Sequence, residues 1–118
     1  MTVHQMTGDS ADGILEENDF VVIDFCAPWC APCRSYERVF DAVAERHPEA
    51  AFCRVDIEQD KSLAEAFDVK SIPMTVVVRD HVLLLMQPGT LSESALEDIV
   101  TRARTIDTSV LRAEAKEG

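Results

Sequence analysis

The sequence predicts an α/β fold in which helices flank a mixed central β-sheet on both faces. Apolar runs alternate with amphipathic stretches along the chain, one apolar run is nearly continuous, and two others are separated by a two-residue turn. Strands joined through helices pair in parallel, whereas a hairpin adds an antiparallel edge. The expected sheet therefore contains both kinds of pairing.

The first half of the chain is expected to form strand, helix, strand, helix, strand. Phe20–Phe25 is apolar and β-branched almost throughout, which is typical of a strand buried on both faces. Arg34–Arg46 carries apolar residues on one face and charges on the other, as a surface helix does. It ends at His47-Pro48, because the residue before a proline is driven out of helical conformation. The other elements are an edge strand at Thr2–Met6, a helix at Ser10–Asn18 and a strand at Ala51–Ile57.

The second half is expected to form a short helix, a hairpin and a last helix. Asp60 is placed to cap a helix that extends to Phe67. Met74–Arg79 and Val82–Met86 form the hairpin around Asp80-His81. The last helix begins at Ser92. Residues 1–104 then form one domain, and residues 105–118 form a polar tail or a helix extension.

The composition of the chain excludes some classes of function. The chain has 118 residues, 47% of them apolar, which fits one domain with its own core. It carries 11 Lys and Arg against 22 Asp and Glu, a formal net charge of −11, so nucleic acids and anionic membranes would repel it. The start lacks a signal-peptide pattern and no apolar run is long enough to span a bilayer. A soluble, cytoplasmic protein is expected.

Cys30 and Cys33 are the candidate reactive pair. They follow the buried strand, and Pro32 suits the first turn of the next helix. The helix N-terminus favours a thiolate through the macrodipole and its unpaired N–H groups. Cys30 is therefore expected to be the exposed, attacking nucleophile. Cys33 is expected to be more buried and to attack the mixed disulfide that Cys30 forms with a substrate.

Zinc binding and plain burial are the other interpretations of this pair. Zinc needs two further ligands at similar spacing, whereas Cys53 stands alone and no pair of histidines accompanies it. In a cytoplasmic protein, two cysteines spaced in this way after a buried strand favour redox chemistry. Neither a metal nor a bound cofactor is expected.

The sequence resembles the thioredoxin family from about Asp9 to Arg104. The matching motifs, at matching spacing, are Asp24-Phe25, Trp29-Cys30-Ala31-Pro32-Cys33, Ile72-Pro73 and Gly89. The resemblance implies the thioredoxin fold, protein-disulfide clients and re-reduction by a thioredoxin reductase, a flavoprotein that takes electrons from NADPH. Nothing in the sequence demands more than a monomer.

The resemblance also implies roles for single residues. Pro73 resembles the family's cis-proline, which presents the backbone of Ile72 to a bound peptide; the alternative is an ordinary proline at a strand start. Asp24 resembles the family's buried carboxylate. Desolvation would raise its pKa and let it take the proton of Cys33; the alternative is a carboxylate that faces water. The remaining substrate-groove residues are Trp29, Ala31, Pro32 and Gly89.

Several positions depart from the family pattern. Ala31 replaces the usual glycine, and Met74 follows the proline where threonine is common. Cys26 stands in place of a tryptophan and is interpreted, like Cys53, as a small buried apolar residue. Arg54 replaces a lysine and, being always charged, is expected to hold Asp24 ionised more firmly. These changes leave the catalytic set intact and suggest a specialised member.

The expected function is a thioredoxin-like protein-disulfide reductase. Two alternatives remain open. A disulfide oxidase or isomerase often has histidine between its cysteines, which stabilises the reduced thiolate, whereas Ala31-Pro32 offers no such charge. A binding or assembly module commonly loses one cysteine, whereas this chain keeps both.

Overall fold

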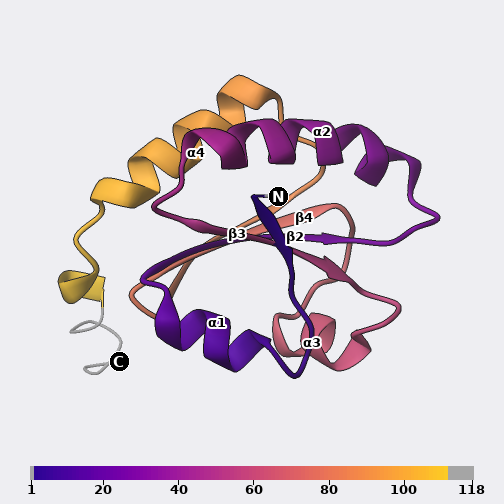
Figure 1. The fold of residues 1–118 in the computed structure, drawn as a ribbon, viewed down its shortest axis with the longest axis horizontal. Coiled ribbons are helices and arrows are strands. Elements are labelled where there is room, and N and C mark those ends of the chain that lie inside the picture. The colour runs from indigo at the N-terminus through magenta and orange to yellow at the C-terminus, as the bar shows by residue number, and fades with distance from the viewer. Residues whose placement is uncertain (1, 112–118) are drawn as a thin grey trace.

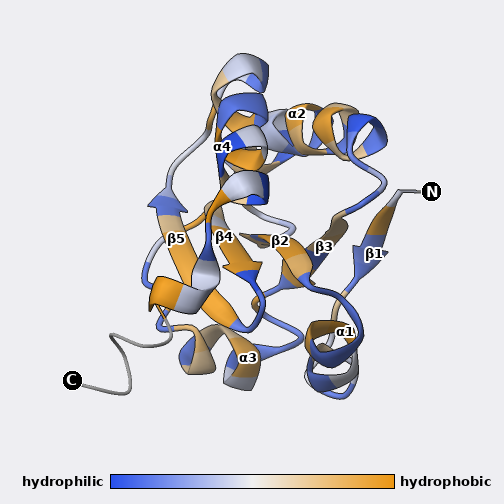
Figure 2. Ribbon diagram, turned by 90° about the vertical axis from the view of Figure 1, so that its left-hand side faces the viewer, coloured by the Kyte–Doolittle hydropathy of each residue, from blue (hydrophilic) through white to orange (hydrophobic). Residues whose placement is uncertain are grey.

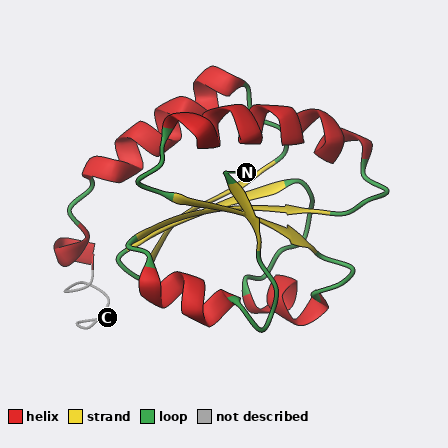
Figure 3. Cartoon of the chain, viewed as in Figure 1, coloured by secondary structure: helices red, strands yellow, loops and turns green. Residues whose placement is uncertain are grey.

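A five-stranded mixed sheet forms the centre of the molecule in the computed structural model, which describes residues 2–111. The strand order is β1-β3-β2-β4-β5. Helices α2 and α4 cover one face and α1 and α3 the other (Figure 1), and the same layers are visible by element type in Figure 3. The expected fold class is confirmed. In chain order the elements are β1 (Val3–Gln5), α1 (Ala11–Glu17), β2 (Phe20–Cys26), α2 (Ala31–Arg46), β3 (Ala51–Asp56), α3 (Lys61–Ala66), β4 (Met74–Arg79), β5 (Val82–Pro88) and α4 (Glu93–Thr105).

Strand β2 is the central strand, and all seven of its residues are buried. Its burial is as the apolar run predicted. It pairs in parallel with β3, as expected for strands joined through a helix, but antiparallel with β4, which differs from that expectation because α3 also connects β3 to β4. β1 pairs in parallel with β3 at one edge. The β4–β5 turn places Asp80 and His81 at φ of 50° and 66°, which is the left-handed geometry that tight two-residue hairpins require.

Because side chains alternate between the two faces of β2, they contribute to two separate hydrophobic cores. Val21, Ile23 and Phe25 pack on the side of α1 and α3, whereas Phe20 and Val22 pack under α2 and α4. Apolar residues concentrate on the central strands and on the inner sides of the helices (Figure 2). Because residues two apart on a strand share a face, every second residue of β2 lies beneath α2.

Helix α2 begins three residues earlier than expected, at Ala31. Pro32 explains this start, since a proline in the first helical turn gives up an N–H that would have no partner there. Ser92 starts α4 as expected, and its hydroxyl accepts the N–H of Ala95 at 3.1 Å. The expectation that Asp60 caps α3 with its side chain is wrong. Its Oδ1 instead accepts the N–H of Gly8 at 2.8 Å, a donor supplied by the loop before α1.

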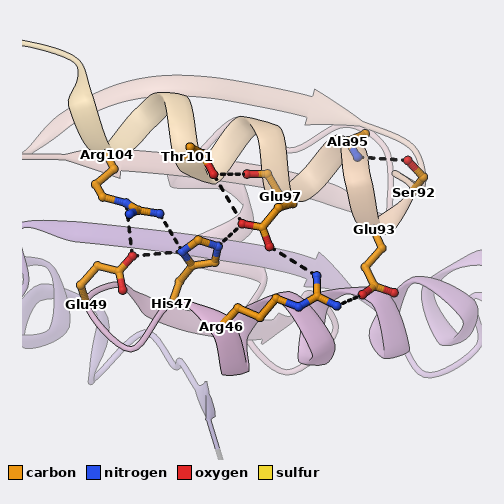
Figure 4. A network of polar contacts seen from close by, with 9 residues as sticks. All are labelled: Arg46, His47, Glu49, Ser92, Glu93, Ala95, Glu97, Thr101 and Arg104. Carbon is orange, nitrogen blue, oxygen red and sulfur yellow. Dashed lines mark hydrogen bonds and ion pairs between the residues drawn. The ribbon is translucent and has the colours of Figure 1, made fainter.

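A polar network fastens the C-terminal end of α2 to α4 (Figure 4). Arg46 forms ion pairs with Glu93 and Glu97. The buried ring of His47 contacts Glu97 through Nε2 and Glu49 through Nδ1, the latter at 3.0 Å. Each exposed ion pair contributes little to the free energy of unfolding. The main effect of the network is therefore to position α2 relative to α4.

The segment after α4 returns to the hairpin turn. Residues 108–111 are helical, and the buried Thr108 donates its hydroxyl to Asp80 Oδ2 at 2.6 Å. The part of the expected tail at 112–118 lies outside the described residues. Within residues 2–111, no helix is long and apolar enough to cross a membrane.

Candidate active site

The cysteine pair lies where β2 ends and α2 begins. Cys30 is the N-cap residue of α2, with an extended backbone at φ −87° and ψ 108°. Its Sγ accepts the backbone N–H of Cys33 at an N···S distance of 3.3 Å. A sulfur in this place satisfies an N–H group that the first helical turn would leave unpaired, and it meets the positive end of the macrodipole. The local geometry therefore favours negative charge on Cys30.

Both cysteines of the pair are buried, which corrects one expectation. Cys30 is 5% exposed and Cys33 3%, so the predicted contrast between an exposed and a protected residue is wrong. They form a cluster with Cys26 and Ala27, and Ile72 packs against it. Ile72 belongs to a loop some forty residues away in sequence, and Ile57 also packs against the cluster.

The thiol of Cys33 is held in its protonated form. Burial is the main reason that its pKa is raised to about 11, and the hydrogen bond with the Cys30 thiol raises it further. Hydrogen bonds with the Ala27 backbone and the Cys26 thiol lower its pKa, but less. Near neutral pH, Cys33 must therefore lose a proton before it attacks a disulfide.

Asp24 is fully buried beneath the cysteines, on the face of β2 that α2 covers. Its Oδ1 accepts the Cys26 thiol at 3.0 Å and its Oδ2 accepts the Arg54 Nε–H at 3.3 Å. Desolvation raises the pKa of Asp24 above its ordinary value, although Cys26 and Arg54 both lower it. The expectation of a buried carboxylate with a raised pKa is confirmed, and the alternative of a carboxylate facing water is wrong.

Arg54 lies beside Asp24, as its position in the sequence suggested. It also donates through Nη2 to Asp41 at 2.9 Å, and its guanidinium lies 5.6 Å from the centre of the Phe40 ring. The charge of Arg54 is therefore shared between a buried and a half-exposed carboxylate. Sequence reasoning missed Asp41. The only indication in the sequence was that Asp41 lies on the predicted helix.

Cys26 was interpreted as a small buried apolar residue, and it is 8% exposed. That interpretation is incomplete, because its thiol donates to Asp24. The available signal was the spacing of Asp24 and Cys26, since residues two apart on one strand project from the same face. Cys53 fits the plain interpretation, because burial alone raises its pKa to about 12.

The expected groove residues lie just before and at the start of α2, just before β4 and just after β5. The Ile72-Pro73 peptide bond is cis, and the N–H of Gly89 donates to the carbonyl of Pro73 at 2.9 Å. Gly89 has φ of 87°, in the left-handed region that favours glycine. Trp29 is 65% exposed, and its indole N–H donates to Glu58, a contact that sequence reasoning missed. Ala31 and Pro32 are exposed on the first turn of α2.

A cavity of about 400 Å³ opens beside Cys33. Cys26, Cys33 and Arg54 line it, together with Glu37. All four cysteines of the chain are free thiols. In the part of the chain that the structure describes, no group of three or more Cys, His, Asp or Glu side chains is placed to hold a metal ion.

This fold, with two cysteines at the start of the helix that follows the central strand, defines the class of thioredoxin-fold thiol–disulfide oxidoreductases. The chain belongs to the thioredoxin family, since the family model described as "Thioredoxin" matches residues 2–102. The resemblance noted from the motifs is thereby confirmed.

Individual relatives agree with this assignment. "Putative thioredoxin 2" of Streptomyces coelicolor is 39% identical over 96% of this chain and 84% of its own. A solved mutant thioredoxin from Halobacterium salinarum is 29% identical with a TM-score of 0.83, covering 89% of this chain and 93% of its own. Mitochondrial thioredoxin 3 of Saccharomyces cerevisiae, at 24% identity, shares the fold with a TM-score of 0.79, over 86% of this chain and 95% of its own.

The chain is a thioredoxin-like disulfide reductase, an enzyme of thiol–disulfide exchange that acts on protein-disulfide clients. The expected function is confirmed, and neither the oxidase or isomerase alternative nor the binding-module alternative is favoured. Members of the family work without a bound cofactor.

Proposed function

We propose that this reductase works through Cys30 as nucleophile and Cys33 as resolving thiol. The observation that carries the proposal is the contact of Cys30 Sγ with the Cys33 N–H at the start of α2, where Cys30 is the N-cap residue. The Cys30 thiolate attacks one sulfur of a client disulfide, forms a mixed disulfide and expels the other sulfur as a thiolate. Cys33 then attacks Cys30 Sγ, and the second client sulfur leaves. The client gains two electrons and the Cys30–Cys33 pair becomes a disulfide.

Asp24 is proposed as the base for the second step. Cys33 must lose its proton to attack, and a general base works best when its pKa lies near the operating pH. Burial raises the pKa of Asp24 above its ordinary value, while the contact with Arg54 favours the ionised form. The Asp24→Asn variant should therefore release the mixed disulfide more slowly near neutral pH, and unchanged release kinetics would exclude this role.

Substrate binding is proposed for the surface around the pair. Trp29 supplies an exposed aromatic side chain, and the Ile72 backbone next to Pro73 offers an edge for an extended client segment. Gly89 lies beside Pro73, to which its N–H is bonded. A side chain at Gly89 would be strained by its positive φ. Ala31 and Pro32 complete the groove on the helix side.

The remaining proposals concern the protein's setting. Electrons come from NADPH through a flavoprotein thioredoxin reductase, in the cytoplasm, where reduced thiols are maintained and the protein supports electron transport and cell redox homeostasis. The chain works as a monomer, with a thioredoxin domain at 1–104 and a C-terminal extension at 105–118. The net charge of −11 supports a role away from nucleic acids and membranes.

Insulin reduction tests the assignment of the cysteines. The wild type should precipitate the insulin B chain in the presence of dithiothreitol, and Cys30→Ser should abolish the acceleration. Cys33→Ser should trap a mixed disulfide with a client peptide at Cys30, seen by mass spectrometry of the proteolysed adduct. Full activity of Cys30→Ser, or an adduct located on another cysteine, would overturn the proposal. Cys53→Ala is the matched control, since Cys53 lies outside the cluster.

A further inference from the structure

The third thiol of the cluster, Cys26, lies between the buried carboxylate and the resolving cysteine. On one side its Sγ donates to Asp24 Oδ1 at 3.0 Å. On the other side it belongs to the same buried cluster as Cys33, and both thiols line one cavity. The side-chain hydrogen bonds of Asp24 within residues 2–111 go to Cys26 and Arg54. The base and the thiol that it must deprotonate are therefore joined through Cys26.

The chemistry of Cys26 suits proton transfer rather than attack on a disulfide. Burial, and next the negative charge of Asp24, raise the pKa of its thiol far above neutral, so it remains S–H at any working pH. A thiol is a weak donor and a weak acceptor at the same atom. Cys26 can thus give its proton to Asp24 while it receives one from Cys33.

We propose that the thiol of Cys26 carries the proton of Cys33 to Asp24 in the step that releases the client. This inference rests on the proposed roles of Cys30, Cys33 and Asp24. As Cys33 Sγ forms its bond with Cys30 Sγ, its proton passes to Cys26 Sγ and the proton of Cys26 passes to Asp24 Oδ1. The bond between Cys30 and the client breaks, and the client sulfur leaves with the electron pair. Asp24 ends protonated and Cys26 ends as it began.

Water in the neighbouring cavity is the competing route. Cys26 and Cys33 both line this cavity, and Glu37 lines it as a second carboxylate. If the proton leaves by this route, Cys26 serves only as packing beneath the loop. The two routes differ in one requirement, because only the relay needs an exchangeable proton on side chain 26.

A matched pair of substitutions separates the routes. Cys26→Val and Cys26→Thr introduce side chains of nearly the same shape, both suited to a strand, and only threonine carries an exchangeable proton. The reduced proteins are mixed with excess of a chromogenic aromatic disulfide in a stopped-flow instrument. A first molecule of coloured thiolate reports attack by Cys30, and a second reports resolution by Cys33. The first phase is an internal check that each variant folds and that its nucleophile works.

The second phase should be about a hundredfold slower in Cys26→Val than in Cys26→Thr at neutral pH, the lower end of what a positioned proton-transfer group supplies. The gap should close as the pH rises toward 11, where Cys33 ionises without help. Equal second phases at neutral pH, or a gap of the same size at every pH, would overturn the relay and assign Cys26 to packing. Absence of a first phase in the wild type would instead overturn the proposed role of Cys30.

Discussion

The buried carboxylate of Asp24 provides a test of the electrostatics on which the site depends. Asp24→Asn keeps the shape of the side chain and removes its charge. Two effects oppose one another, because the substitution relieves the desolvation of a buried anion and removes the ion pair with Arg54 at 3.3 Å. Desolvation is the larger effect, since the pKa of Asp24 is raised and not lowered.

The expected result at neutral pH is a more stable protein. Removing one partner of a buried ion pair usually destabilises, because the other charge is left alone. Arg54 is not left alone, since it keeps Asp41 at 2.9 Å and its side chain is 19% exposed. We therefore expect Asp24→Asn to raise the free energy of unfolding, by at most the roughly 1 to 4 kcal/mol found when both partners of a buried ion pair are replaced by well-packed apolar residues.

The pH dependence has a definite sign. The pKa of Asp24 in the folded state is raised above its ordinary value of 3.8. The folded state therefore binds this proton more tightly than the unfolded state does, and protonation of Asp24 stabilises the fold. This contribution is complete below pH 3.8 and is lost as the pH rises through the raised pKa. The gain in the free energy of unfolding from Asp24→Asn should therefore be largest at neutral pH and vanish in acid.

Urea unfolding measures both parts of this prediction. At neutral pH the midpoint should move up by at most roughly 0.5 to 2 M, given a slope of about 2 kcal/mol/M, the middle of the range for small proteins. Asp41→Asn is the matched control, because it removes a half-exposed partner of the same arginine and should change stability by less than about 1 kcal/mol. A less stable Asp24→Asn at neutral pH, or a gain that persists in acid, would refute the reasoning.

Three further predictions follow from burial and capping. Brief iodoacetamide treatment of the folded protein at neutral pH should modify Cys30 first, because burial raises the pKa of Cys33 to about 11 and that of Cys53 to about 12; earlier modification of either would contradict this. Phe40→Ala should lower the free energy of unfolding by about 3 to 5 kcal/mol, since its ring is fully buried, and a loss below about 1 kcal/mol would contradict the packing. Ser92→Ala should cost about 1 kcal/mol in the same unfolding assay through loss of the hydrogen bond from Ala95, and an unchanged midpoint would argue against this cap.

The fold was largely predictable because its signals are local. The continuous apolar run of β2 required burial on both faces, and Asp80-His81 between two apolar runs required a tight turn. The span of α2 was placed three residues late, at Arg34, because its amphipathic pattern begins there, although Pro32 was assigned to the first turn of this helix. Asp60 was misjudged because its donor, Gly8, lies more than fifty residues away in the chain.

The site was predictable in its residues but less so in its contacts. The cysteine pair and Asp24 were identified from motifs and strand position. Ile57 and Ile72 pack against the cluster that contains Cys30, and the sequence does not show how closely these distant segments pack. The contact of Cys26 with Asp24 required no distant information, since both lie on one face of β2, but its significance depends on α2 placing Cys33 above them.

The reduction potential of the Cys30–Cys33 pair tests the central claim most directly. The protein is equilibrated with mixtures of reduced and oxidised dithiothreitol or glutathione, and the fluorescence of Trp29, the one tryptophan of the chain, follows the redox state. A protein-disulfide reductase should give a value near about −270 mV, where thioredoxin lies. A value near about −120 to −180 mV, in the range of oxidants and isomerases, would contradict the assignment.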